Sequence, residues 1–82
     1  MRIKFVFVVQ TEELDVKELK VELEKEGVIV SEIDEDILSI GDRKCPVTLY
    51  YLDGTLGQYI RIRLKYHCVT AEDSEYVLFP IE

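Results

Sequence analysis

The stretch from Cys45 to Val69 constrains the fold most, because its second half alternates in hydropathy with a period of two. The residues on one side are Ile60, Ile62, Leu64, Tyr66 and Cys68. The residues on the other side are Tyr59, Arg61, Arg63, Lys65 and His67. This alternation is typical of a half-buried strand, and the Asp53-Gly54 pair before it is a strong turn signal. The pattern predicts a long β-hairpin with one core face and one basic face.

The length and composition favour one small folded domain covering residues 1–82. Of the 82 residues, 48% are apolar and 33% are charged, which argues against disorder. No apolar run approaches the ~18 residues of a membrane span, and the apolar run after Met1 lacks a signal-peptide cleavage pattern. We therefore expect a soluble, cytoplasmic protein without membrane contact. The many Glu and Lys residues and the absence of Asn suggest a thermophile.

The first segments predict a central strand and then a helix. Ile3 to Val9 is apolar on both sides of an extended chain, as in strands that are covered on both faces. Asp15 followed by Glu18 is a capping-box pattern, so we place a helix at Val16 to Glu26. Gly27 is the expected left-handed residue after it. The apolar stripe of this helix is narrow, so either the sheet curls onto itself or a homodimer supplies the missing layer. We favour curling, and thus a monomer.

The rest of the chain predicts strands only. Val28 to Ile33 and Ile37 to Ile40 flank Asp34-Glu35-Asp36, which suggests an acidic-tipped hairpin. Tyr76 to Phe79 is a last short strand. The predicted fold is α+β, with one main helix packed on a largely antiparallel, curled sheet in the order β-α-β-β-β-β-β. The first two strands would be parallel if they were neighbours. The expected core is Phe5, Phe7, Val9, Leu19, Leu23, Ile60, Ile62 and Leu64.

Three segments carry a resemblance to a group of known proteins. Ile3-Lys4-Phe5-Val6-Phe7-Val8-Val9, Leu14-Asp15-Val16 and Ile33-Asp34-Glu35-Asp36 resemble small, uncharacterised acidic proteins of methanogenic archaea. The resemblance implies a compact α+β domain and an archaeal origin. It also raises calcium binding as a possibility, without assigning residues to it.

Clustered carboxylates make weak divalent-cation binding the first functional hypothesis. The candidate ligands are Asp34, Glu35 and Asp36 at the acidic tip and Glu72, Asp73 and Glu75 in the loop before the last strand. Ligand sets made only of oxygen select Ca²⁺ or Mg²⁺ over zinc, and Ca²⁺ tolerates irregular geometry. The spacing is not that of an EF-hand, so we expect a dissociation constant of about 10⁻⁴ to 10⁻³ M or weaker. The alternative is an acidic tip that only solubilises the protein.

The second hypothesis is an interaction module that uses the basic face of the predicted 45–69 hairpin. Its candidate residues are Arg61, Arg63, Lys65, His67 and Tyr59, for a protein or a nucleic-acid partner. A nucleic acid is the less favoured partner because the net charge is −7. The basic face would be neutralised internally if Glu22 and Glu26 of the helix lay over it.

Patterns for catalysis are missing, so we expect no enzymatic activity. The chain has one His and no glycine-rich loop that opens a helix. Cys45 and Cys68 are the only cysteines and are expected to be reduced thiols, too far apart for a disulfide. Together with His67 they do not form a zinc pattern.

Overall fold

The computed structural model describes residues 1–10, 15–68 and 76–81, which form two helices and four strands. The elements are β1 (Arg2–Val9), α1 (Val16–Lys25), β2 (Ile29–Ile40), β3 (Arg43–Thr55), α2 (Leu56–Lys65) and β4 (Tyr76–Ile81). The α+β class is confirmed. The predicted order of one helix and six strands is wrong, since the observed order is β-α-β-β-α-β, that of split βαβ or ferredoxin-like folds.

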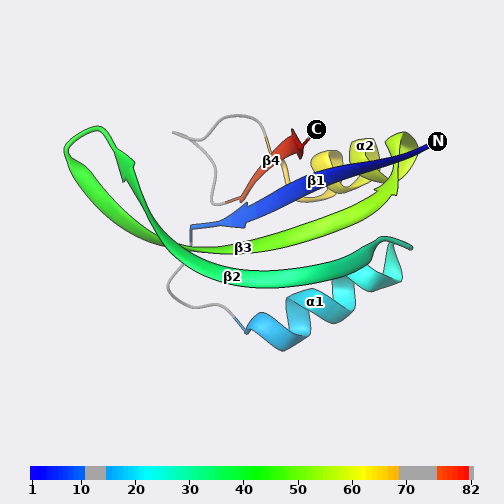
Figure 1. Ribbon diagram of the computed structural model, residues 1–82, viewed down its shortest axis with the longest axis horizontal. Coiled ribbons are helices and arrows are strands. Elements are labelled where there is room, and N and C mark those ends of the chain that lie inside the picture. The colour runs from blue at the N-terminus through cyan, green and yellow to red at the C-terminus, as the bar shows by residue number, and fades with distance from the viewer. Residues whose placement is uncertain (11–14, 69–75, 82) are drawn as a thin grey trace.

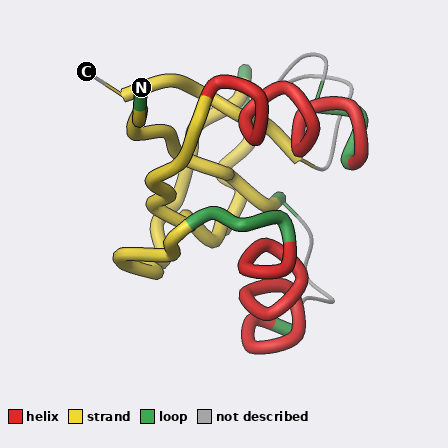
Figure 2. The backbone as a smooth tube through the Cα atoms, turned by 90° about the vertical axis from the view of Figure 1, so that its right-hand side faces the viewer, coloured by secondary structure: helices red, strands yellow, loops and turns green. Residues whose placement is uncertain are grey.

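The sheet has the strand order β2-β3-β1-β4, and all neighbouring strands are antiparallel. β1 and β2 run in the same direction but are separated by β3, so they are not the parallel neighbours considered above. Both helices lie on one face of this sheet (Figures 1 and 2). The described residues therefore form two layers, with a helical side and a side that no helix covers.

The first helix begins and ends close to where its sequence signals indicated. The Asp15 carboxylate accepts a hydrogen bond from the Glu18 N–H at 3.1 Å, which caps the start of α1. The helix ends at Lys25, with Glu26 as its C-terminal cap, and Gly27 follows with a φ of +94°. That left-handed conformation favours glycine, as predicted.

The predicted 45–69 hairpin is wrong, because β3 continues through Asp53-Gly54 and the chain then enters α2. The Thr55 hydroxyl accepts from the Gln58 N–H at 3.2 Å, and the Gln58 side-chain oxygen accepts from the Thr55 N–H at 2.8 Å. This reciprocal capping box starts a helix where a turn was expected. Gly54 has no positive φ. A Cβ there would meet a Val28 methyl at 2.8 Å, so its role is close packing.

The predicted acidic hairpin is also wrong, because β2 is one strand of 12 residues. It pairs with β3 from Ile29 to Ile40, with a bulge between Val30 and Glu32, and the turn lies at Gly41-Asp42 instead. Gly41 has a φ of +61° in that turn. The long ladder with β3 replaces the short local pairing of Ile33 with Ile37. Beyond Val9 of β1 the two strands continue as a bent arm (Figure 1).

The main core fills the space between the helices and the sheet. Its fully or almost fully buried residues include six of those predicted: Phe5, Phe7, Val9, Leu19, Leu23 and Ile62. Ile60 and Leu64 were predicted to join them but are 47% and 70% exposed. Residues two apart share a side in a strand and lie on nearly opposite sides of a helix. Tyr59 and Ile62 of α2 face the core, together with Tyr66, the C-terminal cap of this helix.

Candidate binding face on the open side of the sheet

The side of the sheet that faces away from the helices is largely apolar. Val6 pairs with Tyr51 and Phe79, and Val8 pairs with Leu49 and Val77, so these cross-strand partners project to the same side. We call this side the open face. Its apolar residues are Val6 and Val8 of β1, Ile29 and Leu38 of β2, Val47, Leu49 and Tyr51 of β3, and Val77, Phe79 and Ile81 of β4.

The middle of the open face is a second, smaller apolar cluster. Val8, Val47 and Val77 are buried against one another and against the partly buried Leu38 and Leu49. The cluster contains none of the residues of the main core. β1 therefore contacts apolar neighbours on both of its sides, as its sequence predicted, although no described helix covers the second side.

The end of the open face around Lys4 and Asp53 exposes large apolar side chains on both edge strands. Phe79 is 45% exposed, Ile81 is 37% exposed, and Ile29 at the start of β2 is 56% exposed. Single exposed apolar residues are ordinary, but several on one face are typical of interaction surfaces. No local sequence pattern marks these residues as a binding surface. The available signal was β1 itself, a strand apolar on both sides in a chain with too few elements to cover both.

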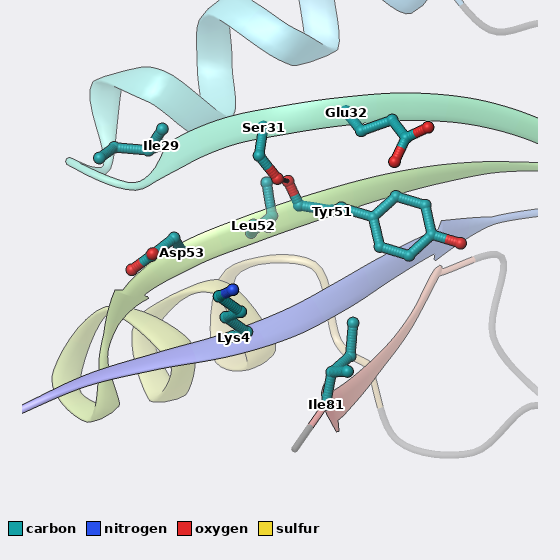
Figure 3. A pocket seen from close by; sticks show the side chains of 8 residues that line it. All are labelled: Lys4, Ile29, Ser31, Glu32, Tyr51, Leu52, Asp53 and Ile81. Carbon is teal, nitrogen blue, oxygen red and sulfur yellow. Dashed lines mark hydrogen bonds between the residues drawn. The ribbon is translucent and has the colours of Figure 1, made fainter.

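A hollow of about 360 Å³ lies at this end of the open face (Figure 3). All four strands contribute to it, and its lining residues are Lys4, Ile29, Ser31, Glu32, Tyr51, Leu52, Asp53 and Ile81. Ser31 is the extra residue of the β2 bulge, and its hydroxyl donates to the Tyr51 carbonyl at 3.1 Å. The Arg2 guanidinium holds the Asp53 carboxylate at 2.8 Å. The lining of the hollow thus combines apolar side chains with the charged groups of Lys4, Glu32 and Asp53.

One margin of the open face is acidic. Glu32, Asp34 and Asp36 of β2 are exposed and stand beside Tyr51, Leu49 and Val47 of β3. We call these three carboxylates the acidic edge. The Asp34 side chain accepts from the Glu35 N–H at 2.9 Å, and the Asp36 side chain accepts from the Ile37 N–H at 2.7 Å. These bonds occupy backbone donors of an edge strand, a device that limits strand addition.

The predicted calcium ligands do not form a compact group among the described residues. Asp34, Glu35 and Asp36 lie on an extended strand and not at a hairpin tip, and Glu35 points to the side opposite its two neighbours. Glu72, Asp73 and Glu75 lie outside the described residues. Within residues 1–10, 15–68 and 76–81, no cluster of three or more His, Cys, Asp or Glu side chains has the geometry to hold a metal ion. Calcium binding stays a prediction.

The strand face that was to carry the basic partner-binding residues does not exist, because these residues lie in and just after α2. Arg61 and Lys65 approach the carboxylate of Glu26, the C-terminal cap of α1, at 3.8 and 3.3 Å, so Glu26 partly neutralises them. Tyr59 turns inward and packs edge-on against Phe5 at 5.3 Å. Arg63 and His67 are exposed, and His67 follows the helix with a φ of +54°. The five residues therefore do not share one surface.

Burial raises the pKa of several groups on the helical side of the sheet. It raises the pKa of the Cys68 thiol to about 11, which makes this cysteine a poor nucleophile at neutral pH. Burial, with the Asp15 carboxylate nearby, raises the pKa of Tyr50 to about 12, and the Tyr50 hydroxyl donates to the Val16 carbonyl at 3.0 Å. Burial and the Glu22 carboxylate raise the pKa of Tyr66 to about 12. Cys45 and Cys68 are both free thiols.

Comparison with models of protein families, with curated proteins and with solved structures finds no match to this chain. No helix among the described residues is long and apolar enough to cross a membrane.

Proposed function

We propose that this domain is an interaction module that binds a segment of another protein on the open face of its sheet. The observation that carries the proposal is the exposure of Phe79 and Ile81 next to Val6 and Tyr51, on a face that no described helix covers. Burying such side chains against a partner removes apolar surface from water. The module would use this face in place of the basic hairpin face proposed from the sequence.

Site-specific photo-cross-linking tests this function directly. A photoreactive amino acid in place of Phe79 should give a cross-linked product with a second, different protein in the cells that produce this one. The matched control carries the same amino acid in place of Leu64, which is exposed on the helical side and should give no such product. Products from position 64 alone, or only self-cross-linked products from position 79, would contradict the proposal.

Weak divalent-cation binding is a second, separate candidate. The observation in its favour is that Glu32, Asp34 and Asp36 line one side of the same strand. Crowded carboxylates repel one another, and a cation such as Ca²⁺ relieves that repulsion. A calcium titration followed by amide NMR should give saturable shifts confined to residues 32–37, and these should disappear in the double variant Asp34→Asn, Asp36→Asn. Shifts that never saturate and that spread over all acidic segments would exclude a site.

A further inference from the structure

We infer that the partner segment is an amphipathic α-helix with basic side chains along one flank, and this inference rests on the proposed function. The open face is apolar from Val6 to Val8 of β1 and over the neighbouring parts of β3 and β4. Its basic side chains on β1, Arg2 and Lys4, lie at one end, where Arg2 is paired with Asp53. The exposed carboxylates follow β2, which contains no basic residue. A partner that covers the apolar strip also lies next to Glu32, Asp34 and Asp36. Lys or Arg at that margin would complement the carboxylates, whereas apolar or acidic groups would leave them desolvated or repelled.

The edges of the sheet argue for docking on the face and not for addition of a strand. On β2, the Asp34 and Asp36 carboxylates already accept from the Glu35 and Ile37 N–H groups. On β4, the opposite edge strand, Pro80 has no N–H to donate. A peptide that extended the sheet would meet occupied or missing donors on both sides. A helix needs no backbone partner and avoids this difficulty.

The dimensions of the face fit one helix lying along β1. Three neighbouring strands about 4.8 Å apart make an apolar strip about 10 Å wide, and a helix with its side chains is about 10–12 Å across. Alternate residues of a strand are about 6.8 Å apart, and helix residues four apart are separated by about 6 Å along the axis. Lys or Arg side chains at i, i+4 and i+8 therefore match the spacing of Glu32, Asp34 and Asp36.

Charge disfavours the other occupants of this face. Two copies packed face to face place the acidic edges together, or place each acidic edge over the apolar β4 of the other copy, and each copy carries a net charge of −7. Nucleic-acid phosphates would meet the same carboxylates. The basic residues of α2 lie on the helical side of the sheet and do not offset the acidic edge (Figure 2).

Two synthetic helical peptides of about four turns test the inference. The Lys peptide has Leu at i, i+3, i+4 and i+7 and Lys along one flank. The Glu peptide is identical except that Glu replaces each Lys. Amide NMR shifts locate binding, and calorimetry measures affinity. The Lys peptide should shift the amides of Val6, Tyr51 and Phe79, and the Glu peptide should bind far more weakly.

Two triple variants separate local charge contacts from overall charge. The first variant, Glu32→Gln, Asp34→Asn, Asp36→Asn, removes the charges of the acidic edge. It keeps side-chain oxygens that can accept from the Glu35 and Ile37 N–H groups. Its affinity for the Lys peptide should be about tenfold lower or more. The control Glu18→Gln, Glu24→Gln, Asp42→Asn changes three exposed residues elsewhere and removes the same charge. It should change affinity by less than about threefold.

Several outcomes would overturn the inference. An equal loss of affinity for the Lys peptide in both triple variants would mean that net charge alone attracts it. Amide NMR shifts confined to α1 or α2 would place the peptide on the helical side of the sheet. Equal binding of the two peptides on the open face refutes the basic flank but leaves the proposed function standing. A dimer formed through the open face, or tighter binding of a short RNA there, replaces the helix as occupant. Absence of any peptide shift overturns the inference, and the Phe79 cross-link then decides the proposed function separately.

Discussion

Among single residues, Tyr50 ties the sheet to the start of α1. Its side chain is fully buried in the core, and its hydroxyl donates to the Val16 carbonyl at 3.0 Å. A phenol in this setting must stay neutral, because burial disfavours the phenolate and the nearby Asp15 carboxylate repels it. The pKa of Tyr50 is therefore about 12 in the folded protein, compared with an ordinary value of 10.0.

The raised pKa of Tyr50 predicts a loss of stability at alkaline pH. A group whose pKa is higher in the folded state contributes its full stability below the unfolded pKa and loses it as pH rises through the folded pKa. The free energy of unfolding should therefore begin to fall near pH 9, because the pKa of Cys68 is raised from 9.0 to about 11. It should fall further between pH 10 and 12, because the pKa values of Tyr50 and Tyr66 are raised from 10.0 to about 12. Tyr50→Phe removes the hydrogen bond to Val16, which should lower the free energy of unfolding by about 1 kcal/mol at pH 7. The free energy of unfolding of this variant should also decrease less steeply at alkaline pH. Urea unfolding at several pH values measures this, and equal slopes in both proteins would contradict it.

Ile62 and Leu64 give a direct test of the helical assignment of residues 56–65. Ile62 is fully buried and Leu64 is 70% exposed. Ile62→Ala should lower the free energy of unfolding by about 2–5 kcal/mol, because it leaves a cavity in the core. Leu64→Ala should change it by less than about 0.5 kcal/mol. Chemical denaturation compares the two, and similar losses would favour a strand with both residues on one core face.

Among the elements, α2 depends on the capping box at the end of β3. Thr55→Ala removes the acceptor for the Gln58 N–H and should cost about 1 kcal/mol of stability, within the usual range for such caps. Thr55→Ser keeps the hydroxyl and serves as the matched control. Thermal and urea unfolding should rank wild type and Thr55→Ser together, with Thr55→Ala below them. The reverse ranking would mean that the methyl group of Thr55 matters more than its hydroxyl.

For the whole molecule, we expect the protein to be a monomer at micromolar concentration when no partner protein is present. Self-association through that face would bury or oppose the carboxylates of Glu32, Asp34 and Asp36, and the net charge of −7 repels a second copy. Sedimentation velocity should give the mass of one chain in wild type and in the double variant Phe79→Ser, Ile81→Ser. A dimer in wild type that disappears in the double variant would identify the open face as a self-interface.

The local sequence determined those elements whose signals lie within a few residues of one another. Asp15, Glu18 and Gly27 mark both ends of α1, and the apolar run of β1 correctly indicated a central strand with apolar contacts on both sides. The predicted core residues of β1 and α1 are buried as expected. These features follow from capping and from continuous apolar runs, which need no distant partner.

Contacts between segments that are distant in sequence set the helical state of residues 56–65 and the course of β2. The alternation of Ile60, Ile62 and Leu64 fits a strand, while Tyr59, Ile62 and Tyr66 fit a helix, and the packing of the latter three against the core selects the helix. β2 is continuous because β3, more than ten residues away for most of its pairs, supplies a partner along its whole length. Register with that partner placed Asp34 and Asp36 beside an apolar face. The sequence does not show which residues lie beside Asp34 and Asp36, because cross-strand contacts are made with chain segments that are distant in sequence.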